Sequence, residues 1–112
     1  MPAALLYAAQ AVDPLGVPCG PIKIGETSSW PRRQTEIRAW LPAGHDITQL
    51  LSIPRSKMGA QVLESRLHFD LDHHRIPQAE APCASREWFE GCVEVRRVLT
   101  ATHQRLALKG AA

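Results

Sequence analysis

The chain has 112 residues, of which 45% are hydrophobic and 21% are charged. These proportions are typical of globular proteins and exclude an intrinsically disordered chain. A chain of this length buries roughly two thirds of the surface that its unfolded form exposes, which is enough for one hydrophobic core without disulfides or a structural metal. We therefore expect a single domain over residues 1–112.

We expect neither a membrane span nor a signal peptide. No stretch approaches the ~18 consecutive apolar residues of a spanning helix, and no basic residue precedes the short apolar run at the N-terminus. The three cysteines, Cys19, Cys83 and Cys92, include no C-x-x-C pair, which argues against a disulfide framework and a four-cysteine zinc site. We expect reduced thiols, a cytoplasmic location and no membrane partner.

The charge balance permits a nucleic-acid partner without establishing one. Thirteen Lys and Arg residues against eleven Asp and Glu residues leave a net charge of only +2. Ten of the thirteen basic residues are arginine, whose planar guanidinium makes forked contacts with phosphate.

The N-terminal third predicts a β-hairpin. Residues 3–12 are apolar at nearly every position, as in a strand that is covered on both faces, although their alanines leave a helix as the alternative. Residues 13–21 contain three prolines and two glycines, which predict a turn that no regular element crosses. Residues 22–25 include two isoleucines in alternation and predict the second strand.

Two serines followed by a Trp-Pro pair at residues 28–31 predict the start of a helix, because serine caps the free N–H groups and proline suits the first turn. Pro42 and Gly44 predict its end near Leu41. By helical spacing, Arg33 shares a face with Trp30, Ile37 and Trp40 and should point inward. Arg32 lies four residues before Glu36, so we expect a solvent-exposed ion pair there.

The remaining elements follow the same reasoning. Residues 45–53 predict a third strand that Pro54 ends, and residues 56–72 predict a helix with its apolar face at Met58, Val62, Leu63, Leu67 and Leu71. Residues 75–85 predict a loop, residues 86–89 an extended piece, and residues 91–108 a last helix that buries Val95, Val98, Leu99, Thr102 and Leu106. This order predicts an α+β fold with a small antiparallel sheet flanked by helices.

Several common catalytic motifs are missing. The sequence has no glycine-rich phosphate loop, no H-E-x-x-H and no G-x-S-x-G, which leaves Walker-type nucleotide hydrolysis, zinc proteolysis and α/β-hydrolase chemistry without support. His73 and His74 are adjacent. Because neighbouring side chains on a helix or strand diverge, we expect a solvated helix end there rather than a metal site.

The residues that could carry chemistry are Tyr7, Lys23, Arg33 and Glu64. Singly, each also fits a structural role: a core tyrosine, a lysine at a strand edge, an arginine packed over a tryptophan, and a surface glutamate. Together they supply what phosphodiester cleavage needs. These needs are a base for water, a cation for the charge that develops on the phosphate, and a carboxylate for a divalent metal.

These residues and their order resemble the GIY-YIG nuclease superfamily, and in particular its phage-type and meiotically up-regulated-gene-type branch. That branch has K-I-G as its second signature and closes with an E-W-F block. The resemblance covers about residues 5 to 100. The matching segments are Leu5-Leu6-Tyr7, Lys23-Ile24-Gly25-Glu26-Thr27, Arg33 eight residues after Gly25, Glu64-x-x-x-His68-Phe69 and Glu87-Trp88-Phe89.

The resemblance implies a three-stranded antiparallel sheet flanked by helices, and a metal-dependent endonuclease that cleaves DNA. It implies that Glu64 holds one Mg²⁺ or Mn²⁺ ion, that Tyr7 helps to deprotonate the attacking water, and that Arg33 clamps the phosphate. Lys23 stands where many relatives have a tyrosine and would orient water or phosphate as a cation. Gly25 would let the backbone approach the site closely.

The chain also departs from the superfamily pattern. Leu5 and Leu6 replace the Gly-Ile of the first signature, the connection from Tyr7 to Lys23 is longer than usual, and no asparagine exists to match the one late in many relatives. His68 has two interpretations: a hydrogen-bonding residue near the metal, or a packed histidine that joins its helix to the E-W-F strand.

Two other functions stay open. One is a catalytically inactive nucleic-acid-binding module with the same fold, and the other is an accessory domain that acts through a protein partner. Likeness of fold does not choose among these three functions.

Overall fold

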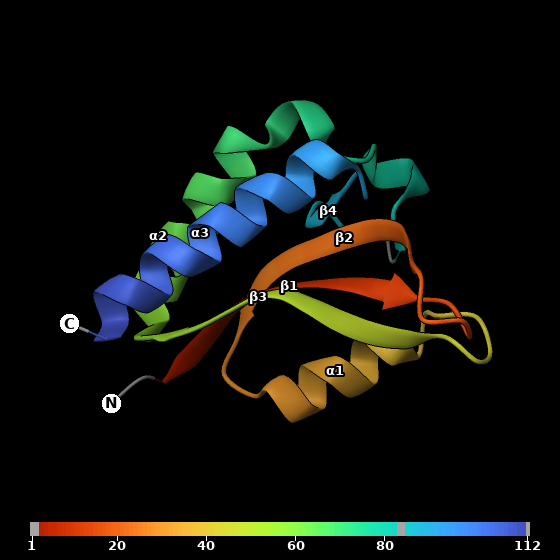
Figure 1. Ribbon diagram of the computed structural model, residues 1–112, viewed down its shortest axis with the longest axis horizontal. Helices are drawn as coiled ribbons and strands as arrows, with labels where there is room; N and C mark the ends of the chain where they lie inside the picture. Colours follow the sequence, from red (N-terminus) through yellow and green to blue (C-terminus); the bar gives the residue numbers. More distant parts are fainter. Residues whose placement is uncertain (1–2, 83–84, 112) are drawn as a thin grey trace.

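A four-stranded antiparallel sheet in the order β3-β1-β2-β4 forms the centre of the computed structural model, which describes residues 3–82 and 85–111. Helix α1 covers one face of the sheet, and α2 and α3 cover the other (Figure 1). The predicted α+β class is confirmed, with one short strand more than expected. The elements are β1 (Ala4–Val12), β2 (Pro18–Thr27), α1 (Trp30–Arg38), β3 (Asp46–Arg55), α2 (Lys57–Asp70), β4 (Trp88–Phe89) and α3 (Val93–Ala111), with 3₁₀ turns at Asp72–His74 and Gln78–Glu80.

Strand β1 is apolar on both sides because helices cover both faces of the sheet. Leu6 and Ala8 belong to the core under α2 and α3, whereas Tyr7 and Ala9 belong to the smaller core under α1. The prediction of a strand rather than a helix over residues 3–12 is therefore confirmed. Alternation of side chains across the pleat sends Tyr7 to the α1 side.

The turn between β1 and β2 is shorter than predicted. It occupies residues 13–17, where the Asp13 carboxylate accepts hydrogen bonds from the N–H groups of Leu15 and Val17 and Gly16 has φ of +82°. The expectation that no element crosses residues 13–21 is wrong, because β2 already begins at Pro18. Its prolines lie at the strand start and beside a bulge, which are positions that tolerate a missing N–H donor.

Pro54 does not end the third strand as predicted. It pairs with Leu5 within β3, which continues to Arg55. Strand β3 is at the edge of the sheet, and proline is tolerated in edge strands because one side of the ladder is unpaired. The helix α2 then begins directly after Ser56, whose hydroxyl accepts the N–H of Gly59.

Helix α1 begins at the predicted place and ends earlier than predicted. Ser29 caps it by accepting the N–H of Arg32. The last helical residue is Arg38, and residues 39–40 form a turn instead of continuing to Leu41. Trp40 nevertheless packs against Trp88, with ring centroids 6.1 Å apart.

The predicted apolar face of α2 is confirmed in part. Leu63, Leu67 and Leu71 pack in the core as predicted, together with Ala60, whereas Met58 and Val62 are exposed and the predictions for these two are wrong. Helix α3 buries Val95, Leu99, Thr102 and Leu106 as predicted, and the prediction for Val98, on the flank of that stripe, is wrong. No helix in residues 3–82 and 85–111 is both long and apolar enough to cross a membrane. Cys19 and Cys92 are free thiols, and Cys83 lies outside the described residues.

Candidate functional site

The register of the central strands brings Tyr7 and Gly25 together. Tyr7 on β1 lies directly opposite Gly25 on β2. A Cβ atom built on Gly25 would lie 2.9 Å from the Tyr7 hydroxyl oxygen, so any larger residue would collide with the hydroxyl. The missing side chain therefore allows the Tyr7 ring to lie across β2. Lys23 is two residues away on β2 and points to the same face of the sheet.

Arg33 approaches this place from α1. The Tyr7 side chain is fully buried, and its ring packs against Trp30 with centroids 5.1 Å apart. Burial raises the pKa of Tyr7 well above its usual value, and the nearby Arg33 guanidinium partly opposes that rise. The Tyr7 hydroxyl and Nε of Arg33 are both buried without a hydrogen-bond partner among the described residues. Two such groups side by side can accept a water molecule or a phosphate oxygen.

The neighbouring arginine behaves as predicted. Arg32 lies on the exposed side of α1, with its Nε 3.5 Å from a carboxylate oxygen of Glu36. Helical phase thus separates a solvated arginine from an inward one, although the two are adjacent in sequence.

Glu64 reaches the site from α2. The pKa of Glu64 is raised from 4.5 to about 7. Burial is the largest cause, the negative charges of Glu87 and Glu26 act in the same direction, and Lys23 acts against them. The charge of Glu64 also raises the pKa of Tyr7. Strand β4 pairs only with Ile22 and Lys23 of β2, so no strand covers the rest of that edge of β2. The Glu64 side chain can therefore lie at this edge.

An ion pair between a buried lysine and a partly exposed glutamate lies at the other end of the site. Lys23 is only 2% exposed, and its Nζ lies 2.6 Å from Oε2 of Glu87. The ammonium also lies 5.8 Å and 5.4 Å from the ring centroids of Trp40 and Trp88. Sequence reasoning quoted Glu87 as part of the E-W-F block without assigning it to the site. A lysine within an apolar strand is the signal that could have found it, because a buried ammonium requires a counter-charge.

His68 joins α2 to the sheet. Its Nε2 lies 2.8 Å from the Ile24 carbonyl oxygen and donates to it, and its ring packs edge-on against Phe89 with centroids 5.0 Å apart. The same nitrogen lies 3.9 Å from Oε1 of Glu64. Burial lowers the pKa of His68, which favours the neutral ring. The histidine therefore fixes the helix that carries Glu64 and also lies next to that carboxylate.

The structure thus brings five predicted residues into one region. Charges on Glu64, Glu87 and Arg33 all act on the Tyr7 hydroxyl. The model of one family, the T5orf172 domain, matches residues 5–104, a range that includes all of these side chains. The chain belongs to the T5orf172 domain family. This domain occurs in phage-type and GIY-YIG-like endonuclease-related proteins, so a nuclease-like or DNA-binding module is indicated. No curated protein and no solved structure matches the chain.

This T5orf172 domain has a second group of ligand-type side chains, at the start of α3. One ligand atom each from His73, His74 and Glu94 lies within 4.8 Å of the others, so the three could hold a metal ion. The expectation that the two histidines diverge is wrong. They lie in the 3₁₀ turn Asp72–His74, whose tighter winding leaves their rings only 4.1 Å apart.

His74 already has two partners there. Its Nδ1 and Nε2 each lie 2.9 Å from a carboxylate oxygen, of Glu90 and Glu94 respectively. The hydrogen bond with Glu90 raises the pKa of His74 above its usual value, and Glu94 acts in the same direction. His74 thus ties the 3₁₀ turn to the start of α3.

The buried pair makes a prediction about stability. Glu87→Ala leaves the Lys23 ammonium buried without a counter-charge, so we expect the free energy of unfolding to fall by about 2–3 kcal/mol. The double variant Lys23→Met/Glu87→Leu should regain most of that loss, because neither charge remains. Arg38→Ala removes an exposed pair with Asp46 and should cost less than about 1 kcal/mol. Urea unfolding at pH 7 measures all three, and equal losses for Glu87→Ala and Arg38→Ala would contradict the prediction.

Glu64 makes a prediction about pH. Its pKa is about 7 in the folded protein, against 4.5 for an unperturbed glutamate, so the folded form binds more protons between these values and loses stability as the pH rises through them. Glu64→Gln removes this titration. We expect the variant to match the wild type near pH 4.5 and to be more stable at pH 8 by on the order of 1 kcal/mol, after allowance for solvent screening.

Thermal unfolding at both pH values, without divalent ions, tests this. The control Glu36→Gln changes an exposed carboxylate on α1 and should keep the pH dependence of the wild type. A Glu64→Gln difference that is the same at pH 4.5 and pH 8 would show that burial of this carboxylate has no energetic consequence.

Proposed function

We propose that this chain is a metal-dependent endonuclease of the GIY-YIG type that cleaves phosphodiester bonds in DNA. The observation that carries the proposal is that three groups from different elements lie close enough to influence one another's charge. They are the Tyr7 hydroxyl of β1, which lies beside Gly25, the Arg33 guanidinium of α1 and the Glu64 carboxylate of α2. Arg33 lowers the pKa of Tyr7, and Glu64 raises it. Membership of the T5orf172 domain family supports the same class of function.

The carboxylates fit a divalent cation. Glu64 holds its proton up to about pH 7 because burial and the charges of Glu87 and Glu26 disfavour another negative charge. A site with this excess of negative charge is stabilised by a cation, and carboxylate oxygens suit the hard ions Mg²⁺ and Mn²⁺. Glu64 would be the ligand. The bound ion would supply Lewis-acid stabilisation of the charge that develops on the phosphate.

Arg33 and Tyr7 would act on the substrate. The Nε of Arg33 has no hydrogen-bond partner among the described residues, so the guanidinium keeps an unused donor for a phosphate oxygen. At neutral pH the Tyr7 phenol keeps its proton, since burial raises its pKa. Arg33 lowers that pKa, and any further cation acts in the same direction. Tyr7 would therefore hold the attacking water through its oxygen, and it would accept the water's proton only as the phenolate, after its own proton has passed to solvent.

Lys23 and His68 would be positioning residues. At 2% exposure, Lys23 is too deeply buried to contact a phosphate directly, so its role would be to hold Glu87 beside the site. His68 would hold α2 against β2 through the Ile24 carbonyl, which keeps Glu64 near the strand edge.

Nicking of supercoiled plasmid tests the proposal. We expect cleavage with Mg²⁺ or Mn²⁺ and none with excess chelator, and a loss of at least about 100-fold in rate for Glu64→Gln, which keeps the size of the side chain. Arg33→Ala should lose most activity. The matched control is Arg32→Ala, which removes only an exposed pair and should change the rate little.

Undiminished nicking in chelator, or equal losses for the two arginines, would contradict this mechanism. If the wild type binds duplex DNA in a salt-dependent manner but cuts it with no divalent ion, the chain is a binding module. If it neither binds nor cuts, an accessory domain that requires a protein partner is the remaining function.

Tyr7→Phe separates chemistry from stability. The hydroxyl makes no hydrogen bond among the described residues, so its removal should leave the free energy of unfolding unchanged within about 0.5 kcal/mol or raise it slightly. The cleavage rate should fall by roughly 10²–10⁴-fold, as for a lost acid–base group. Urea unfolding and the nicking assay on the same preparation measure both. A variant that loses about 1 kcal/mol and cuts normally would make Tyr7 structural.

A further inference from the structure

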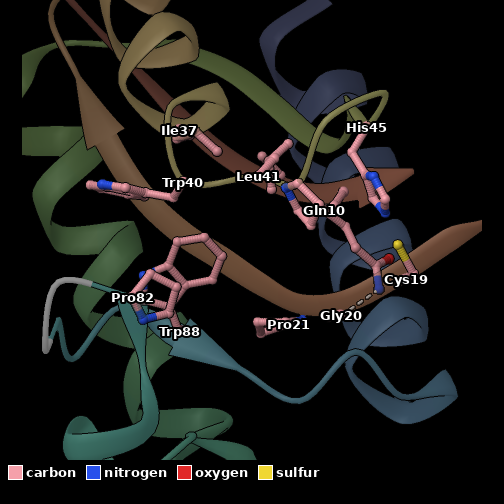
Figure 2. A pocket seen from close by; sticks show the side chains of 13 residues that line it. Gln10, Cys19, Gly20, Pro21, Ile37, Trp40, Leu41, His45, Pro82 and Trp88 are labelled. Carbon is pink, nitrogen blue, oxygen red and sulfur yellow. Dashed lines mark hydrogen bonds between the residues drawn. The ribbon is translucent and has the colours of Figure 1, made fainter. Parts of the chain in front are cut away.

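An apolar pocket lies beside the candidate site, between the C-terminal end of α1 and strands β1 and β2. Its volume is about 230 Å³. Ala9 and Ala11 of β1 contribute only methyl groups to its lining, which leaves room for a ligand. Figure 2 shows the rings of Trp40 and Trp88 on one side of the pocket, and Cys19 and His45 on the other. The space is smaller than that of a typical drug-sized site and suits one planar ring system.

The pocket lies further along β2 from the candidate site, on the same face of the strand. Along one face of β2, Gly25 lies beside the Tyr7 hydroxyl, Lys23 follows two residues earlier, and Pro21, two further, lines the pocket. The four residues from Gly25 to Pro21 span about 13 Å, a distance that about two nucleotides of an extended strand can cover. A strand with a phosphate at Arg33 and Glu64 can thus place a nearby base at the pocket.

The lining matches the chemistry of a nucleobase. Trp40 is 38% exposed and stands edge-on to Trp88, so aromatic surface is available for stacking. Two lining residues carry a buried polar atom that no described residue pairs: Oε1 of Gln10 is an acceptor, and Nε1 of Trp88 is a donor. A base has both donors and acceptors along its edges, whereas an aliphatic ligand would leave these atoms unpaired.

We propose that this pocket binds one unstacked nucleobase of the strand whose phosphate occupies the site formed by Tyr7, Arg33 and Glu64. The inference rests on the proposed function for the identity of the ligand, but base binding itself requires no cleavage. It makes the substrate a DNA with a base that can leave its stack beside the cut, such as a single-stranded or mismatched position.

The test compares two single strands of eight nucleotides, one of thymidines and one of abasic residues, which carry the same phosphates. Binding to the full-length Glu64→Gln protein is measured by fluorescence anisotropy. We expect the abasic strand to bind roughly tenfold more weakly or worse, as loss of base–aromatic stacking predicts. Adding Trp40→Ala should bring the thymidine strand to the abasic level. Phe69→Ala is the matched control, because it removes an aromatic ring that is 80% exposed on α2, and it should keep the difference.

A second pocket variant keeps the test decisive if Trp40→Ala disturbs the fold. Ala11→Leu adds a branched side chain to the half-exposed lining and should have the same effect, with circular dichroism as the check on folding. Equal binding of the two strands to the Glu64→Gln protein, or a difference that survives both pocket variants, overturns the proposal. If the wild type cuts no DNA but the base-dependent difference requires Trp40, the nuclease proposal fails and the pocket proposal stands.

Discussion

The ion pair between Lys23 and Glu87 determines where the sheet ends and therefore where the candidate site lies. An ammonium that is 2% exposed needs a counter-charge, and Glu87 supplies it across 2.6 Å. The backbone carbonyl of Glu87 also accepts the N–H of Ile24, which leads the chain directly into the short strand β4. Because β4 then pairs only with Ile22 and Lys23, the edge of β2 beyond them is left for the side chains of α2.

Several polar groups at that edge lower the stability of the folded state, each for a separate physical reason. Glu64 holds a raised pKa because it is half-buried near two other carboxylates. The Tyr7 hydroxyl and Nε of Arg33 are buried without partners among the described residues. Groups of this kind concentrate at functional sites, where a ligand supplies the missing charge or hydrogen bond. The pocket lined by Trp40 and Trp88 adds apolar surface next to these charges, which is the combination that a phosphate and its base would require.

Much of the fold follows from local chemistry in the sequence. Ser29 and Ser56 cap their helices where the sequence places them, and helical phase correctly separates Arg32 from Arg33. The α+β class and the hairpin were likewise predictable, because apolar periodicity and proline-rich turns are local signals. Among the candidate site residues, Tyr7, Lys23, Arg33, Glu64 and His68 were all named from residue type, order and resemblance to a family. The closeness of their side chains was not readable from that order.

Other features depend on which elements become neighbours. Pro54 stays within a strand because β3 is an edge, and Pro21 because the pairing beside it contains a bulge. Met58 and Val62 of α2 were misjudged because the apolar residues of this helix occupy two stripes, and only the packing on β1 and β2 selects the stripe with Leu63, Leu67 and Leu71. Glu87 enters the site through a lysine 64 positions earlier. The sequence by itself determined most helices and strands and the residues whose side chains could take part in catalysis, since these depend on residue type and on near neighbours in the chain. Only the tertiary structure decided which strands lie at the edges of the sheet, which side chains pair and how the pKa values shift, since these depend on contacts between distant segments.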